Sequence, residues 1–183
     1  MKKVALVIGH RLGAPGAKNP TTGTTEFGFN EGLAIKIKRI LDDSPGIETA
    51  IIYRESYGTL PAQINALKPD FIISLHCNAY DCKTSGTEVL YYHQSDAGRK
   101  MAETLQRHLV KAIELRDRGI KGVTSEDRGG DLLTTTCAPC IIAEPFFIDN
   151  DNDIEIVREK QGALIAAYAQ AIIDIAAGLE AEK

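Results

Sequence analysis

Three short apolar runs in the sequence each end on a side chain that can bind a metal ion or move a proton. VALVIGH ends at His10, DFIISLH ends at His76, and APCIIAE ends at Glu144. Short, continuous apolar runs of this kind are typical of strands that are buried on both faces. If the three strands are parallel neighbours, their carboxyl ends meet at one edge of a sheet, where ligands bind in open α/β folds. We therefore expect these three side chains to lie together.

A fourth side chain, Glu26, opens a helical pattern over residues 26–42. It shares one helical stripe with Asn30, Leu33 and Ile37, and an apolar stripe of this kind packs against the core. A glutamate at a helix start also complements the helix dipole. On this stripe, however, the carboxylate would be buried, which is costly unless the group has a partner. We therefore expect Glu26 to be a metal ligand.

Two histidines and one carboxylate are a ligand set of catalytic zinc sites, because three protein ligands leave the fourth position open. His10, Glu26 and His76 are thus predicted to hold one Zn²⁺ per chain. Successive ligands are 16 and 50 residues apart, so the prediction rests on the joint pattern and not on a local spacing motif. Glu144 is the candidate catalytic residue, since one carboxylate can accept a proton from water and return it to a leaving amine. The alternative is a buried glutamate that is paired with an arginine or a lysine.

The sequence has four cysteines, Cys77, Cys82, Cys137 and Cys140. Their spacing allows a structural zinc site, and the CAPC segment allows a thiol redox module that uses Cys137 and Cys140. Cys77 and Cys140 lie inside strand-like runs, however, and CAPC leads into a strand where a redox motif would open a helix. We expect four reduced thiols outside the chemistry.

The elements that must position these residues alternate along the chain. Strands are expected at residues 4–8, 48–53, 71–75, 87–92 and 140–143. Helices are expected at residues 26–42, 96–116 and 153–177, the last with Asn152 as its N-cap. This order predicts an α/β fold, a single twisted and mostly parallel sheet flanked by helices on both faces. No repeat or linker divides the chain, so residues 1–183 are predicted to form a single catalytic domain.

Composition narrows the possible partners. The 183-residue chain has a net charge of −4, which gives no electrostatic case for binding nucleic acid or an anionic membrane. The apolar run after the first lysines is too short for a signal peptide, and no run approaches the roughly 18 apolar residues of a membrane span. We expect a monomer that is synthesised in the cytoplasm without a signal peptide and is not inserted in a membrane.

Taken together, the motifs resemble the zinc-dependent N-acetylmuramoyl-L-alanine amidases of the amidase-3 type, found in bacterial cell-wall enzymes and phage endolysins. The resemblance covers about residues 4–176 and is carried by VIGH, TTEFGFN, IIYR, DFIISLHCNA, SGTEVLYY and APCIIAEPFFIDN. It implies that His10, Glu26 and His76 bind zinc, that Glu144 is catalytic and that peptidoglycan is the substrate. It also implies action on the cell wall after release, by a holin-type or lysis-dependent route.

The chain departs from this pattern at three positions. Arg11 follows Gly-His where glycine is common, Gln63 stands where an arginine is usual, and Pro145 follows Glu144 where glycine is common. None of these changes removes a ligand, so they bear on substrate detail more than on chemistry.

Asn78, Arg11 and His93 are the candidate substrate-binding residues. His93 is included because it follows a strand and could line the cleft.

Four other functions stay open. A zinc peptidase could cut within the peptide stem, and a zinc carboxypeptidase would need a cation to hold the terminal carboxylate. A thiol redox module would use CAPC, and a non-catalytic wall-binding protein would need none of the four site residues. The joint presence of His10, Glu26, His76 and Glu144 argues against the last of these.

Overall fold

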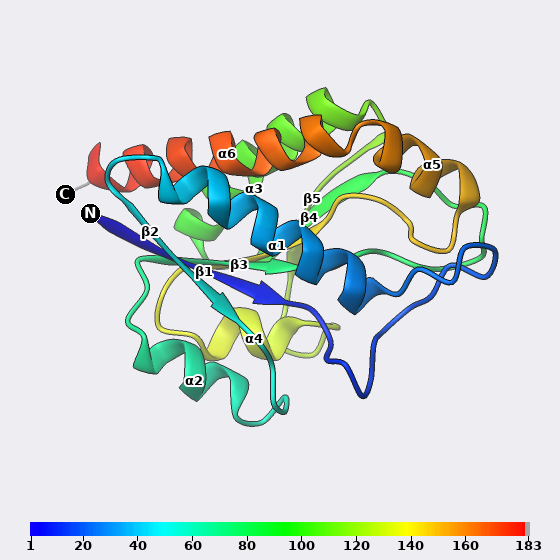
Figure 1. Ribbon diagram of the computed structural model, residues 1–183. Helices are drawn as coiled ribbons and strands as arrows, with labels where there is room; N and C mark the ends of the chain where they lie inside the picture. The colour runs from blue at the N-terminus through cyan, green and yellow to red at the C-terminus, as the bar shows by residue number, and fades with distance from the viewer. Residues whose placement is uncertain (182–183) are drawn as a thin grey trace.

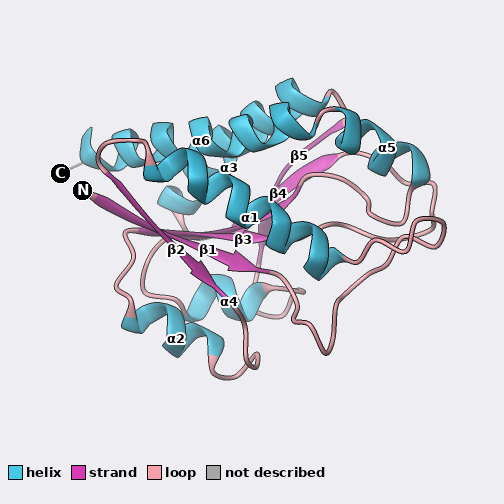
Figure 2. Cartoon of the chain, in the orientation of Figure 1, coloured by secondary structure: helices cyan, strands magenta, loops and turns pink. Residues whose placement is uncertain are grey.

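The computed structural model describes residues 1–181 and contains one six-stranded sheet with the strand order β2-β1-β3-β6-β4-β5 (Figures 1 and 2). The strands are β1 (Lys2–Ile8), β2 (Ile47–Ile52), β3 (Phe71–Leu75), β4 (Thr87–Tyr92), β5 (Asp117–Val123) and β6 (Cys140–Glu144). Only the β4–β6 pair is antiparallel within this sheet. The predicted twisted, mostly parallel sheet is confirmed.

Helices cover both faces of the sheet, as predicted (Figure 1). The larger layer holds α1 (Glu26–Asp42), α3 (Asp96–Ile113), α5 (Asp151–Glu159) and α6 (Gln161–Ala181). The smaller layer holds α2 (Leu60–Ala66) and α4 (Gly130–Thr135). Beside α2 and α4, the sheet residues Val7, Ser74, Leu90 and Ile142 line a cleft.

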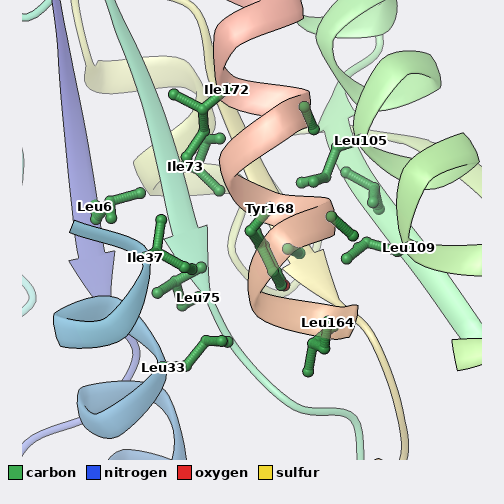
Figure 3. Packing of buried hydrophobic residues seen from close by; sticks show 14 of the residues in the cluster. Leu6, Leu33, Ile37, Ile73, Leu75, Leu105, Leu109, Leu164, Tyr168 and Ile172 are labelled. Carbon is green, nitrogen blue, oxygen red and sulfur yellow. The ribbon is translucent and has the colours of Figure 1, made fainter. Parts of the chain in front are cut away.

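The two faces explain why the strands are apolar throughout. Along β1, Val4, Leu6 and Ile8 belong to the core under the larger layer, while Ala5 and Val7 belong to the core under α2 and α4. Successive side chains of a strand point to opposite faces, so a strand that is covered on both sides needs apolar residues at every position. Figure 3 shows the larger core, in which Leu6 and Ile73 lie close to side chains of α1 and α6.

Helix α6 corrects one expectation. Its segment Gln161–Leu179 is long and apolar enough, by length and composition, to cross a membrane. In the structure this helix packs against α1 and α3, and Tyr168 and Ile172 are fully buried (Figure 3). A helix that lies between two others in a core has apolar residues around much of its circumference, which accounts for this composition.

The C-terminal helical segment also differs from the prediction. One helix was expected over residues 153–177 with Asn152 as its cap, but α5 and α6 are separate. Asn150 is the N-cap of α5, and its side chain accepts from the backbone N–H groups of Asn152 and Asp153. Asn150 takes this position because its oxygen satisfies two N–H groups at the helix start that have no intrahelical partner.

The predicted strand ends meet as the prediction required. In the sheet β1, β3 and β6 are adjacent and parallel, and Leu75 of β3 is in register with both Ile8 of β1 and Ala143 of β6. The residues that follow these positions therefore leave the sheet at one edge. Strand β2 lies on the other side of β1 and is also parallel to it, so its carboxyl end reaches the same edge.

Candidate active site

His10, Glu26 and His76 lie together at the carboxyl edge of the sheet. His10 Nε2 is 3.0 Å from Glu26 Oε2, and His76 Nδ1 is 2.9 Å from Glu26 Oε1. Their possible ligand atoms all lie within 4.8 Å of one another. The structure therefore brings the three predicted ligands into one cluster, although they come from three separate segments of the chain.

Glu26 is held in place by the helix that it begins and by the loops around it. Thr25 caps α1 by accepting from the N–H of Gly28. The N–H groups of Ala17 and Cys77 donate to the two oxygens of the Glu26 carboxylate. Burial alone would raise the pKa of this fully buried glutamate, but the close contacts and the charges of His10 and His76 outweigh it and lower the pKa well below its ordinary value. Glu26 is thus a carboxylate at neutral pH.

Two glycines allow the close approach of the cluster. A Cβ on Gly9 would lie 2.5 Å from the carbonyl oxygen of Leu75 and 2.7 Å from the ring of His76. A Cβ on Gly16 would lie 2.6 Å from both the Glu26 carboxylate and the ring of His10. Gly16 also has a positive φ of 79°, which residues with a Cβ rarely adopt. Close packing therefore requires glycine at position 9, immediately before His10 in the VIGH motif.

His10 itself has a positive φ of 67°, a conformation that is uncommon for a residue other than glycine. Such backbone strain is concentrated at functional sites, where the surrounding structure maintains it. It turns the His10 ring toward Glu26 immediately after β1 ends.

The donor atoms fit a metal ion. His10 Nε2 is buried and makes no aligned hydrogen bond, despite its 3.0 Å distance to the Glu26 carboxylate. A buried polar nitrogen without a hydrogen bond is rare and needs an explanation. A metal ion that His10, Glu26 and His76 share would provide one, and its donor set of two imidazoles and a carboxylate is the set of catalytic zinc sites.

Glu144 lines a cleft of about 590 Å³ that is also lined by His76. Its Oε2 atom is buried and has no hydrogen-bond partner within residues 1–181. Burial, followed by the negative charge of Glu26, raises the pKa of Glu144 to about 8, although the charge of Arg128 opposes the rise. Glu144 is therefore a carboxyl group that can hold or release a proton near neutral pH, which is the property of a general acid or base.

Of the three candidate substrate-binding residues, the cleft contains Asn78 only. Its side chain donates to Glu88 Oε1 at 2.5 Å, and Arg118 Nε donates to Glu88 Oε2 at 2.8 Å. Arg11 and His93 are exposed and do not line the cleft. Arg11 pairs with Ala14 in its own loop, and the ring of His93 packs edge-on against Tyr92.

The positions of the cysteines disfavour both alternative roles. All four are free, and they form no metal-type cluster within the described chain. Burial raises the pKa of Cys140 to about 12, so this thiol stays protonated near neutral pH. Cys140 begins strand β6, so CAPC does not open a helix.

Several cleft residues lie in segments for which no role was predicted. Tyr57 and Leu60 come from the end of the loop after β2 and the start of α2, and Arg128 and Leu132 come from the start of α4 and the loop before it. Glu88 lies in the strand that was predicted over residues 87–92. A charged residue in such a strand could have identified it as a candidate site residue.

Comparison with known proteins agrees with this geometry. Residues 4–174 match the amidase-3 family model, described as N-acetylmuramoyl-L-alanine amidase. The chain is 25% identical to the N-acetylmuramoyl-L-alanine amidase LytC of Bacillus subtilis over 158 residues, which are 83% of this chain and 30% of LytC. It spans only 51% of a second curated relative, the uncharacterized protein YqiI of the same organism.

Solved structures share the fold over nearly the whole chain. An N-acetylmuramoyl-L-alanine amidase from Clostridium difficile 630 superposes with a TM-score of 0.86 at 22% identity, covering 94% of this chain and 95% of that one. The catalytic domain of CwlV from Bacillus (Paenibacillus) polymyxa var. colistinus gives 0.83 at 22% identity, covering 95% and 97%. On the family match, the chain belongs to the amidase-3 family of N-acetylmuramoyl-L-alanine amidases.

Proposed function

We propose that residues 1–183 act as one catalytic domain that hydrolyses the amide bond between N-acetylmuramic acid and L-alanine in peptidoglycan, with one zinc ion per chain. The observation that carries this proposal is the cluster of His10, Glu26 and His76, whose His76 lines the same cleft as Glu144. The bond that is cleaved is inferred from the description of the matching family, N-acetylmuramoyl-L-alanine amidase.

The three ligands supply what a hydrolytic metal needs. His10 and His76 each direct one ring nitrogen at an oxygen of the Glu26 carboxylate, and the possible ligand atoms of all three residues lie within 4.8 Å of one another. Zinc in this position would polarise the amide carbonyl and lower the pKa of a water molecule. The N–H groups of Ala17 and Cys77, which donate to Glu26, keep that carboxylate from rotating away.

Glu144 performs the proton transfers. Its free Oε2 can accept a proton from the attacking water and then donate it to the leaving nitrogen, which is a poor leaving group until it is protonated. Because the charge of Glu26 contributes to the raised pKa, a cation on Glu26 would lower the pKa of Glu144 from about 8 toward neutrality. That is the range in which one carboxyl group can serve as both base and acid.

Asn78 is the polar group that we assign to substrate binding. Glu88 holds its amide from one side and is itself paired with Arg118, so the amide orientation is fixed before substrate arrives. We assign no substrate contact to Arg11 or His93, which lie outside the cleft.

The substrate places the reaction in the cell wall. We propose that the protein reaches intact peptidoglycan and acts there as a monomer, without insertion of α6 into a membrane, because α6 is part of the hydrophobic core.

Digestion of purified peptidoglycan tests the proposal. The products should be intact glycan strands and free stem peptides with a new L-alanine amino terminus, and Glu144→Gln should release almost none of them. New amino termini on another stem residue would favour the peptidase alternative. No release of peptide by the metal-loaded wild type would refute hydrolysis.

A further inference from the structure

Arg54 is a largely buried arginine whose guanidinium reaches the cleft and has no counter-charge within residues 1–181. It follows β2, lines the same cleft as His76 and Glu144, and is only 8% exposed. No carboxylate of residues 1–181 forms an ion pair with it, and its guanidinium donates no hydrogen bond within that part of the chain. Its guanidinium lies over the ring of Tyr57, whose centroid is 3.7 Å from Arg54 Cζ.

An unpaired charge in this position is unfavourable for folding. Charged groups are rarely buried unless they are paired, and the contact with Tyr57 offsets only part of the cost. Arg128, the other unpaired arginine of the cleft, is exposed and therefore keeps its hydration. The difference indicates that Arg54, and not Arg128, is arranged for an anion that is absent from the protein itself.

The surroundings of Arg54 fix the direction of its guanidinium. The Tyr57 ring covers one face of the planar group, which leaves the N–H edge free to donate. Gln63 Nε2 donates to the carbonyl of Tyr53, the residue before Arg54, and so holds the backbone there. A planar fork with a fixed direction is suited to the two oxygens of a carboxylate.

We propose that Arg54, held by Tyr57, binds a free carboxylate on the peptide part of the substrate, close to the bond that is cut. This inference rests on the proposed function. The muramic acid part offers hydroxyl and amide groups but no charge, because its own carboxyl group is in the scissile amide. The stem peptide, in contrast, carries free carboxylates.

The sheet sets the distance of this carboxylate from the reaction. Strand β2 is separated by one intervening strand from β3, which His76 directly follows, so the carboxyl ends of β2 and β3 are roughly 10 Å apart. An extended peptide advances about 3.3–3.6 Å per residue. The carboxylate should therefore belong to one of the first three residues of the stem.

Substrates that differ in one charge test the inference. Synthetic N-acetylmuramoyl peptides are prepared with each free carboxylate of the first three residues converted in turn to a carboxamide, and kcat and KM are measured. For wild type, one of these amidations should lower kcat/KM by roughly 10–100-fold, mainly through KM. Arg54→Gln should lower kcat/KM for the acidic parent by a similar factor and be insensitive to that amidation.

The controls separate binding from folding. Arg54→Gln should unfold at or above the wild-type temperature, because it removes an unpaired charge. Arg54→Lys keeps the charge and the buried stem but not the fork, so it should fold and still lose most of the discrimination. Arg128→Gln should change all substrates by the same factor. Equal effects of Arg54→Gln on every substrate, or loss of discrimination in Arg128→Gln alone, would overturn the assignment.

If the proposed function is wrong, the experiment gives a different result from the one expected if only the role of Arg54 is wrong. If wild type cleaves none of the compounds, the amide assignment fails, and the same compounds are then tested for binding to wild type and Arg54→Gln by calorimetry. The inference predicts tighter binding of one carboxylate form by wild type and no such preference in Arg54→Gln. Equal binding of all forms by wild type would refute it.

Discussion

Substitution of Gly16 by alanine should weaken zinc binding, although Gly16 is not itself a metal ligand. The added Cβ would lie 2.6 Å from Glu26 Oε2 and 2.6 Å from the ring of His10, whereas ordinary van der Waals contact begins at 3.4 Å. The ligands must therefore move by roughly 0.8 Å, which exceeds the ~0.2 Å tolerance of metal–ligand distances. The expected loss of zinc affinity is about 10–100-fold, as for other changes in the groups that support metal ligands.

Gly23→Ala is the matched control. Gly23 lies in the same loop with a similar φ of 73°, but the nearest atom to its added Cβ is the end of the Lys18 side chain at 3.7 Å. Both variants impose the left-handed backbone on alanine, at a cost of about 1–2 kcal/mol, so both should lose similar stability from this source. Only Gly16→Ala should also lose zinc affinity.

Competition with a zinc chelator, followed in both variants and in wild type, measures the difference. Thermal unfolding of the metal-free proteins reports the backbone cost separately. If Gly16→Ala holds zinc as tightly as Gly23→Ala, the packing of Gly16 against His10 and Glu26 does not shape a metal site, and the reasoning is refuted.

Four further results are expected. Glu144→Gln should lower kcat by ~10²–10⁴-fold with zinc content unchanged, and wild-type turnover would contradict its role. Without the metal, folded Glu144 keeps a proton that the unfolded chain releases above pH 4.5. The free energy of unfolding, measured by urea titration, should therefore fall as the pH rises from 4.5 to about 8. The fall should be less steep in Glu144→Gln, which has no carboxyl group at this position. Cys137→Ser with Cys140→Ser should cost ~0.5–3 kcal/mol of stability and leave one zinc and most turnover; loss of zinc would reveal a thiolate site. Glu88→Ala should leave the Asn78 amide without its acceptor and lower kcat/KM by roughly 10–100-fold, since hydrogen bonds to charged groups contribute about 1.5–3 kcal/mol; an unchanged kcat/KM would exclude this role.

The parts of the fold that the sequence predicted are those with a strong local pattern. Strands β1, β3 and β6 are continuous apolar runs, and α1 has a regular buried stripe from Glu26 to Leu41. Because parallel strands end at one edge, these elements were enough to bring His10, Glu26, His76 and Glu144 together.

The walls of the cleft could not be predicted in the same way. Strand β5 has the sequence DRGIKGV, in which three charges and two glycines oppose strand formation. Helix α2 has seven residues and no side-chain cap, and α4 begins beside two glycines and ends in threonines. These elements form because tertiary contacts override weak local preferences.

The contacts that these elements make were therefore also missed. The pairing of Glu88 with Arg118 requires β5 beside β4. Arg54 lies in a recognised motif, but its lack of a partner is visible only when the surrounding chain is in place.

His10, Glu26 and His76 are proposed to hold the metal on which hydrolysis depends. Elemental analysis of protein purified without added metal, with turnover of peptidoglycan measured on the same samples, tests this proposal most directly. We predict about one zinc per chain in wild type and in Glu144→Gln, loss of zinc and turnover in His76→Ala, and recovery of turnover when zinc is returned to chelator-treated wild type. Full turnover by metal-free wild type would contradict the account.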